Sequence, residues 1–356
     1  MIEQIKEGLW MFLFRFKPYP KYKGNATEIC EQIVQKCWNG KFFQTGACSY
    51  PLFWTRDFAF CTNALMSLGY KKEVHKTLNF ALNHFQKQNK VGCYINRYGK
   101  VMNFPIYAVD TLPLLLYSID TANFNIKPYK DFLNQEIQGF YKKVFNAKKG
   151  IIKEYTHFSS MKDHFIKNSS CYDNCMIALL CKEVTKLKLE NPFKKYNFKK
   201  IITKHFWNGY YFNEDLTNAE VTGDANIFPF WTSVITGKKM FKSCLGYIQT
   251  EKLDKPFPLK YTKENHNGQI AASIFVPTWE GDKIWPFLGL YFIEILIRFN
   301  KPLAQQYLNL YKEQIEKNQN FYELFTKKGE VYKSLFYKAD HSMLWASKYL
   351  YLDSFK

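Results

Sequence analysis

Two carboxylates stand in surroundings that would support acid–base chemistry. Asp173 lies in the segment SSCYDN (169–174), directly before an apolar stretch, and Glu323 lies in the segment NFYELF (320–325). Hydrolysis of a glycosidic bond needs one carboxyl group that protonates the leaving oxygen and a second that acts as base or nucleophile. Asp173 and Glu323 are therefore our candidate catalytic pair.

The two roles require different environments. A general acid must be protonated at the working pH, which requires an apolar or like-charged setting, whereas a base must stay ionised and hold a water. Asp173 follows Tyr172 and leads into an apolar helix, which favours the acid. Glu323 lies in a loop rich in polar residues, which favours the base, with Glu280 of WEGDKIW as the alternative. Helix capping is the competing interpretation for Asp173.

Polar and aromatic residues recur just ahead of the predicted helices, where they would form a binding shell. Carboxylates and amides capture sugar hydroxyls, and aromatic faces pack against the C–H faces of sugar rings. The predicted sugar contacts are Trp54, Arg56, Asp57, Asp110, Tyr172, Asp224, Asn226, Trp279, Glu280, Asp282, Trp285 and His341. Three alternatives stay open: an ion pair between Arg56 and Asp57, core packing of Trp231, Trp279 and Trp285, and a core or capping role for His341.

Helices must position these residues, because apolar residues recur at three- and four-residue spacing through most of the chain. The pattern predicts helices over 26–38, 57–68, 72–88, 109–121, 129–145, 172–188, 229–236, 284–299, 302–317 and 341–352. Short extended pieces at 92–101 and 209–215 are typical of hairpins between helices. No strand–helix–strand alternation indicates a parallel sheet.

Paired helices with polar loops gathered at one end predict an all-α fold, an (α/α)6 toroid with short β-hairpin insertions. Its inner helices would present their N-terminal ends to a central cavity. The 356 residues contain no linker at which to divide them, so we expect a single domain over 1–356.

The net charge of +19 does not indicate a nucleic-acid-binding protein. The lysines are scattered in short runs, and no arginine-rich stripe or nucleic-acid motif accompanies them. A weaker interpretation is that the positive field favours an anionic substrate. Arg97, Lys100 and Lys283 are then the candidates to hold a carboxylate-bearing acceptor.

The nine cysteines are an odd number without the dense framework of a secreted scaffold, which favours reduced thiols in the cytoplasm. Cys171, Cys175 and Cys181 lack a CxxC pair or a histidine at ligand spacing, so we expect neither zinc nor any other cofactor. The apolar run within residues 1–16 is too short to span a bilayer, and Glu3 and Glu7 are unlike a signal peptide. No membrane association is predicted, and the oligomeric state stays open.

Several segments, in order, resemble the α/α six-hairpin glycosidases, the group of processing α-glucosidase I, mannosylglycerate hydrolases, trehalases and neutral invertases. SSCYDN resembles the segment that carries their general acid, and HFWNGYYFNED (205–215) is similar to a recurring hairpin. WEGDKIWPFLGLYFIEIL (279–296) resembles their turn before an inner helix, and 320–350 resembles the closing stretch that contains their base. FWTRDF (53–58) resembles a sugar-gripping segment of invertases and glucoamylase-like enzymes.

The resemblance implies an inverting hydrolase that cleaves a terminal α-linked sugar from a small carbohydrate, such as an α-glucoside, trehalose or a glycosylglycerate. Inversion requires carboxyl groups about 6.5–9.5 Å apart, to leave room for a water. Two alternatives remain. One is a non-catalytic carbohydrate-binding toroid, and the other is a sugar epimerase or lyase that works through His157 or His164.

Overall fold

The computed structural model describes residues 13, 16, 18–264, 279–335 and 337–355. The expectations for the N-terminal segment therefore lie almost wholly outside the described residues. Within the described part the chain forms twelve α-helices and one 3₁₀ helix. The α-helices are α2 (Ala26–Cys37), α3 (Thr55–Ser67), α4 (Lys71–Lys87), α5 (Thr111–Thr121), α6 (Lys130–Val144), α7 (Cys171–Lys186), α8 (Phe198–Phe206), α9 (Gly223–Trp231), α10 (Lys238–Thr250), α11 (Pro286–Phe299), α12 (Lys301–Asn318) and α13 (Ala346–Asp353). The 3₁₀ helix η1 (Lys127–Tyr129) leads into α6.

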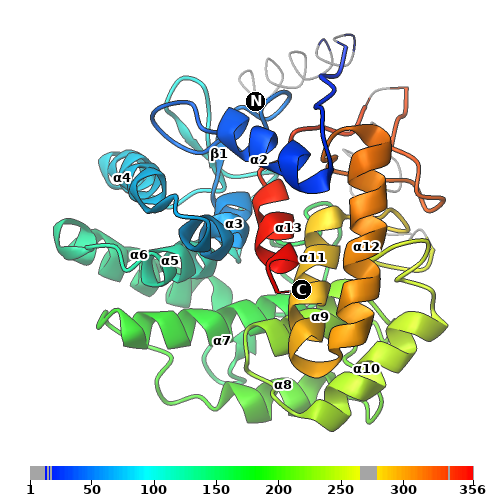
Figure 1. Ribbon diagram of the computed structural model, residues 1–356. Coiled ribbons are helices and arrows are strands. Elements are labelled where there is room, and N and C mark those ends of the chain that lie inside the picture. The colour runs from blue at the N-terminus through cyan, green and yellow to red at the C-terminus, as the bar shows by residue number, and fades with distance from the viewer. Residues whose placement is uncertain (1–12, 14–15, 17, 265–278, 336, 356) are drawn as a thin grey trace.

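Every second helix belongs to a closed inner ring (Figure 1). In the ring α3 contacts α5, α5 contacts α7, and the series continues through α9 and α11 to α13, which contacts α3 again. The helices between them pack on the outside, as α8 does on α7, α10 on α9 and α12 on α11. The predicted all-α toroid is therefore confirmed.

The two sets of helices differ in sequence as their positions require. The inner helix α11, PFLGLYFIEILIRF, is buried over almost its whole circumference. The outer helix α4 instead buries one stripe, including Leu78, Leu82 and Phe85, and exposes lysines on the other side. A helix that is apolar all round belongs in the interior, and an amphipathic one belongs at the surface.

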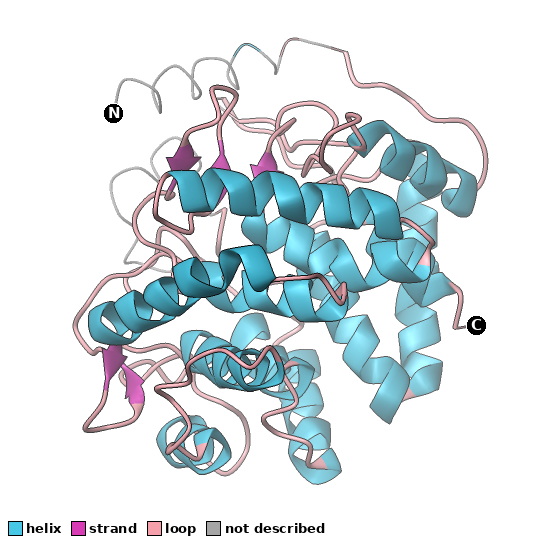
Figure 2. Cartoon of the chain, turned by 90° about the vertical axis from the view of Figure 1, so that its left-hand side faces the viewer, coloured by secondary structure: helices cyan, strands magenta, loops and turns pink. Residues whose placement is uncertain are grey.

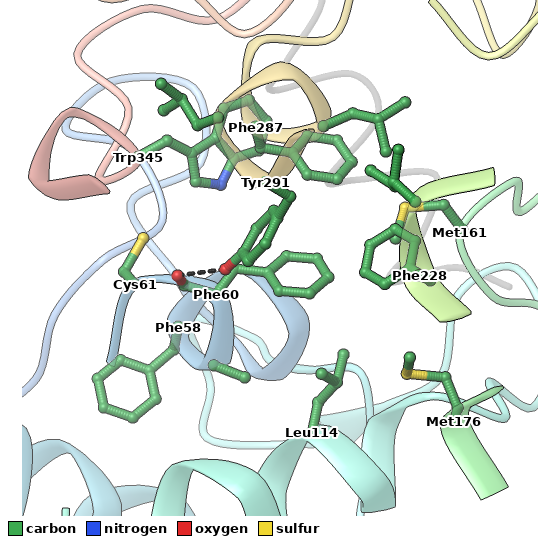
Figure 3. Close-up of a cluster of buried hydrophobic side chains, with 14 of the residues drawn as sticks. Phe58, Phe60, Cys61, Leu114, Met161, Met176, Phe228, Phe287, Tyr291 and Trp345 are labelled. Atoms are coloured by element: carbon green, nitrogen blue, oxygen red, sulfur yellow. Dashed lines mark hydrogen bonds between the residues drawn. The ribbon is translucent and has the colours of Figure 1, made fainter. Parts of the chain in front are cut away.

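Aromatic side chains from the inner helices fill the middle of the ring (Figure 3). Phe60 of α3 stacks on Phe287 of α11 with ring centroids 5.6 Å apart, and it contacts Phe228 of α9 at 6.1 Å. The hydroxyl of Tyr291 donates a hydrogen bond to the carbonyl of Phe60. Met161, from the loop between α6 and α7, is buried in this core, so that loop reaches into the ring.

Two short sheets lie at the edge of the helical body, among the loops that connect the helices (Figure 2). The strands β1 (Phe53–Trp54), β2 (Tyr94–Ile95) and β3 (Val101–Met102) form an antiparallel sheet, and β4 (Phe145–Asn146) pairs with β5 (Ile151–Ile152). The predicted hairpin at 92–101 is confirmed as β2 and β3. At 209–215 the structure has isolated bridges, between Trp207 and Phe212 and between Asn213 and Val221. No helix in the described ranges is long and apolar enough to cross a membrane.

The helix predictions need three corrections. First, α8 and α10 were not predicted, although Asn197 caps α8 by accepting from the Lys200 amide. Second, α9 begins at Gly223 and not at Pro229, because the Thr222 hydroxyl caps it. Third, α13 begins at Ala346 and not at His341, because His341 pairs with Tyr322 in an isolated β-bridge.

Candidate active site

The N-terminal ends of the inner helices meet at one mouth of the toroid, because each outer helix returns the chain to the same end. Asp173 lies in the first turn of α7. Glu323 lies in the loop between α12 and α13. In the ring, α7 and α13 are three positions apart out of six. Glu323 is hydrogen-bonded to Asp340, in the segment that leads into α13, so the two carboxylates belong to opposite sides of the mouth.

Asp173 is buried at the start of α7, where it is 3% exposed. Its amide donates to the Ser170 hydroxyl, which caps the helix. Burial raises the pKa of the Asp173 carboxyl, and the positive charge of Lys167 opposes that shift. Its Oδ1 atom is buried without a hydrogen-bond partner among the described residues. Asp173 thus has a proton-retaining environment and an unsatisfied oxygen, as the acid role requires.

Glu323 is also buried, at 4% exposure, which corrects the expectation of a polar setting. Its Oε2 atom accepts hydrogen bonds from the Tyr337 hydroxyl and, at 2.9 Å, from the Asp340 amide. The Tyr50 hydroxyl lies 3.0 Å from that of Tyr337. Burial raises the pKa of Glu323 to about 8, and the two donors oppose the shift. The carboxyl is therefore held in one orientation through its Oε2 atom.

Two further acids crowd the same side of the mouth. Asp340 accepts from the amides of Ser49 and Tyr50, both at 3.0 Å, and Asp57 accepts from the Trp345 indole at 3.0 Å. Burial raises the pKa of each of these two carboxyls to about 6. Their negative charges add to the upward shift at Glu323. Sequence reasoning missed Tyr50, Tyr337 and Asp340. Asp340 directly precedes His341, which was predicted as a sugar contact.

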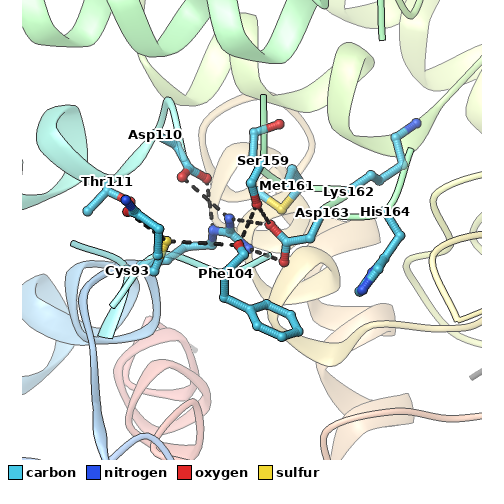
Figure 4. Close-up of polar contacts among 12 residues, drawn as sticks. Cys93, Phe104, Asp110, Thr111, Ser159, Met161, Lys162, Asp163 and His164 are labelled. Carbon is cyan, nitrogen blue, oxygen red and sulfur yellow. Dashed lines mark hydrogen bonds and ion pairs between the residues drawn. The ribbon is translucent and has the colours of Figure 1, made fainter. Parts of the chain in front are cut away.

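Arg56 does not pair with Asp57 as one interpretation supposed, but joins two other acids, Asp110 and Asp163. Figure 4 shows these two carboxylates facing the same group. The Arg56 Nε atom lies 2.8 Å from Asp110 Oδ2, and its Nη2 atom lies 3.0 Å from Asp163 Oδ1. The Tyr172 hydroxyl donates to the same Asp110 oxygen at 2.9 Å. Arg56 thus links the start of α5 to the loop before α7, and Asp163 was not singled out from the sequence.

Glu280 is hydrogen-bonded to the same loop before α7. Its carboxylate accepts from the amides of Asp163 (2.7 Å) and His164 (2.9 Å), and it lies 3.1 Å from His164 Nδ1. Burial alone would lower the pKa of His164, but Glu280 raises it overall. Because Glu280 is committed to this loop, it is a poorer candidate for the base than Glu323. The same contact engages the His164 ring, one of the two histidines considered for an epimerase or lyase. Burial lowers the pKa of the other, His157.

Lys162 in the same loop is fully buried and was also missed. Its ammonium contacts Glu214 and lies 3.8 Å from Asp224 Oδ1. That Asp224 oxygen has no hydrogen-bond partner among the described residues. Asp224 lies in the first turn of α9 and shares the Lys162 ammonium with Glu214.

The predicted tryptophan platforms have different fates. Trp54 stacks on Tyr94 at 4.5 Å, and Trp279 stacks on Trp285 at 5.6 Å. The indole nitrogens of Trp54 and Trp279 are buried without a partner in the described part. Trp231 ends α9, where it packs on Phe60 and Tyr291 and donates to Glu294 at 3.0 Å, in agreement with the alternative of core packing.

Two predicted sugar contacts serve the fold. The Asn226 side-chain amide is hydrogen-bonded to the backbone: its oxygen accepts from the Phe212 amide, and its nitrogen donates to the carbonyls of Phe212 and Thr222. His341 is 1% exposed, its ring lies 4.0 Å from that of Tyr19, and burial lowers its pKa to about 4. Both assignments as sugar contacts are corrected.

Two of the cations predicted to hold a carboxylate-bearing acceptor, Lys283 and Arg97, lie in different surroundings. Lys283 contacts the neighbouring Asp282, which also lies 3.3 Å from Lys327. Arg97 lines a cavity against α4. Within the described residues no group of three or more histidine, cysteine or acidic side chains is placed to hold a metal ion.

The comparisons with known proteins show the fold. No protein-family model and no curated protein matches the sequence. Among solved structures, a rhamnosidase from Klebsiella oxytoca with rhamnose bound superposes with a TM-score of 0.66 at 10% identity over 94% of this chain. This chain spans 65% of the length of that rhamnosidase.

Two further structures match over nearly their whole length. A family 63 mannosylglycerate hydrolase from Thermus thermophilus, in complex with Tris and D-glycerate, has a TM-score of 0.64 at 10% identity, covering 92% of this chain and all of that one. A glycosidase variant in complex with glucose has a TM-score of 0.63 at 10% identity, covering 98% of this chain and 97% of that one. The chain therefore has the toroid fold of the six-hairpin glycosidases.

Proposed function

We propose that this toroid is an inverting glycoside hydrolase that cleaves a terminal α-linked sugar from a small glycoside. The observation that supports the proposal best is the pair of buried carboxyl groups on opposite sides of the mouth, Asp173 on α7 and Glu323 before α13. Attack by water on one face of a sugar and protonation of the leaving oxygen on the other require such an opposed pair.

In the proposed reaction Asp173 gives its proton to the glycosidic oxygen as the bond to the anomeric carbon breaks. Glu323 takes a proton from the attacking water, which adds to the opposite face. Because Oε2 of Glu323 is held by Tyr337 and Asp340, Oε1 is the oxygen that holds the water. Tyr337 positions the base and, as a donor, favours its ionised form.

The substrate is a small carbohydrate whose hydroxyls would form hydrogen bonds with polar atoms at the mouth. The buried atoms without a hydrogen-bond partner among the described residues include one acceptor, Asp173 Oδ1, and two donors, the indole nitrogens of Trp54 and Trp279. Unpaired buried polar atoms are unfavourable, so a polyhydroxylated ligand gains by pairing them. The sugars bound to the similar structures, rhamnose and glucose, have this character. The nine free thiols support a reducing compartment, the cytoplasm.

Product release should be measured from a panel of α-glycosides: trehalose, sucrose, maltose, isomaltose, glucosylglycerate and mannosylglycerate. We expect one class to be cleaved, and cleavage to vanish in Asp173→Asn and Glu323→Gln. The anomer released first, followed by NMR, distinguishes inversion from retention. Cleavage that survives both changes would contradict the assigned pair. No cleavage of any substrate, together with sugar binding, would favour a non-catalytic carbohydrate-binding toroid.

A further inference from the structure

A cavity of about 430 Å³ has neither Asp173 nor Glu323 in its lining. It is bounded by α4, the loop before β1 and the turn between β2 and β3. Its lining includes Phe42, Phe80, His84, Asn96, Arg97 and Gly99. None of these residues contacts Asp173 or Glu323 in the interactions described above. Small-molecule sites commonly have volumes of about 300–1,000 Å³, so the cavity is large enough for a sugar ring.

Aromatic rings form the apolar part of the cavity. Phe42 and Phe80 stack with centroids 4.2 Å apart and planes 14° from parallel, and His84 lies 4.4 Å from Phe80. All three side chains are only half-buried. An apolar surface of this kind suits the C–H face of a sugar.

Asn96 provides a fixed hydrogen-bond donor. It is 4% exposed, and its Oδ1 accepts from the amides of Tyr98 (3.0 Å) and Lys100 (2.9 Å). These two bonds fix the orientation of the side-chain amide. Its Nδ2 atom is buried with no hydrogen-bond partner in the described part of the chain. A buried amide nitrogen without a partner is unfavourable and is satisfied when a ligand supplies an acceptor.

His84 provides an acceptor at the same cavity. Its Nδ1 atom lies 2.8 Å from the Phe80 carbonyl, which can only accept, so Nδ1 carries the hydrogen and Nε2 is left as acceptor in the neutral ring. Gly99 lies beside that nitrogen, since a Cβ atom there would be 3.3 Å from Nε2. A side chain at this position would therefore crowd Nε2.

An oriented donor, an acceptor and an aromatic surface together match the hydroxyls and the C–H face of a sugar. We propose that this cavity is a second carbohydrate-binding site, which holds a sugar ring away from the bond that is cleaved. The inference rests on the proposed function only in naming carbohydrate as the ligand class.

The test uses the full chain carrying Asp173→Asn and Glu323→Gln, so that no sugar is consumed. Glucose, rhamnose, trehalose and maltotriose are the probes, and hydrogen–deuterium exchange with mass spectrometry follows each peptide. We expect a sugar to protect the turn at 96–100 and the segment at 80–84. Adding Asn96→Asp keeps the Oδ1 acceptor for the turn but removes the donor, and it should weaken this protection about tenfold in apparent Kd.

Asn146→Asp is the matched control. The Asn146 Oδ1 atom accepts from the amides of Lys148 and Lys149 in a similar turn, and Asn146 is not among the lining residues of the cavity. Equal protection with and without Asn96→Asp, or protection confined to the mouth at 54–57 and 170–173, would overturn the second site. If Asn96→Asp does not fold, Phe42→Leu replaces it, with the same expected loss.

The two proposals fail separately. Protection at 96–100 in a protein that cleaves no substrate would contradict the hydrolase and keep the second site. Cleavage without protection at 96–100 would keep the hydrolase and overturn the second site.

Discussion

At the scale of single residues, the two catalytic candidates differ in how they are held. The Asp173 Oδ1 atom has no partner among the described residues, whereas Glu323 is fixed by two donors to one oxygen. A free oxygen suits a group that must approach the leaving atom. A fixed carboxyl suits one that must aim a water.

The raised pKa of Glu323, about 8, predicts the pH dependence of activity. A base works only when it is deprotonated, so kcat/KM should rise as the pH rises through this value. Tyr337→Phe removes a donor that favours the carboxylate, which should move the rising limb to higher pH. Tyr155→Phe, at a residue 88% exposed, is the control and should leave the limb in place. A limb at the same pH in Tyr337→Phe would contradict the positioning role of Tyr337.

Arg56 is predicted to stabilise the fold through its two acidic partners. Arg56→Met would leave Asp110, fully buried, and Asp163 without their cation. Removal of one partner of a buried ion pair costs about 3–5 kcal/mol, so the free energy of unfolding in urea should fall by that amount. The comparison is Arg298→Met, which removes a side chain bonded to the Phe230 carbonyl at 3.1 Å. We expect a smaller loss there, and similar losses in both variants would argue against the ion-pair contribution.

At the scale of elements, close approach of backbones determines where the inner helices sit. Gly289 on α11 faces the Pro258 carbonyl and the Tyr311 hydroxyl, with no room for a Cβ atom. The Tyr311 hydroxyl donates to the Pro258 carbonyl, and the Pro286 carbonyl lies 3.1 Å from the same hydroxyl. This glycine therefore brings α11, α12 and the loop before α11 together.

Gly289→Ala should destabilise the protein by about 1–3 kcal/mol, because overpacking forces the neighbouring backbone to move. Gly246→Ala on α10 is the matched control, since a Cβ atom there meets nothing within 4 Å. It should stabilise by about 0.5–1 kcal/mol, the usual preference for alanine within a helix. Urea unfolding of both variants gives the comparison, and a gain in stability from Gly289→Ala would show that the contact can relax.

At the scale of the whole molecule, the ring is closed by the two ends of the described chain. The last helix, α13, packs against both α2 and α3. The last helix therefore supplies contacts that α2 and α3 do not obtain from the helices next to them in sequence. This topology supports one folding unit.

We predict a single cooperative unfolding transition for the full chain. Tryptophan fluorescence and far-UV circular dichroism should give coincident urea curves, since two-state behaviour requires that different probes agree. As a control, removal of 346–356, which contain α13, should abolish the transition, while removal of 354–356 should leave it unchanged. Two separate transitions in the full chain would contradict the single-domain prediction.

The sequence by itself determined the features that depend on neighbouring residues. The helix predicted over 284–299 and the place of Asp173 at the start of the helix predicted over 172–188 follow from local spacing, and the structure has them as α11 and α7. The order of the motifs then indicated a toroid. These predictions succeed because helix periodicity and capping are decided within a few residues.

Tertiary structure alone decided what surrounds each side chain. Arg56 finds its partners 54 and 107 residues away, and Glu323 is buried although its neighbours in sequence include polar residues. Asn226 and His341 are in motifs that predicted sugar contacts, yet both are engaged by the fold. The burial and charge that set a pKa come from segments far apart in the chain, and no local pattern records which of them will meet.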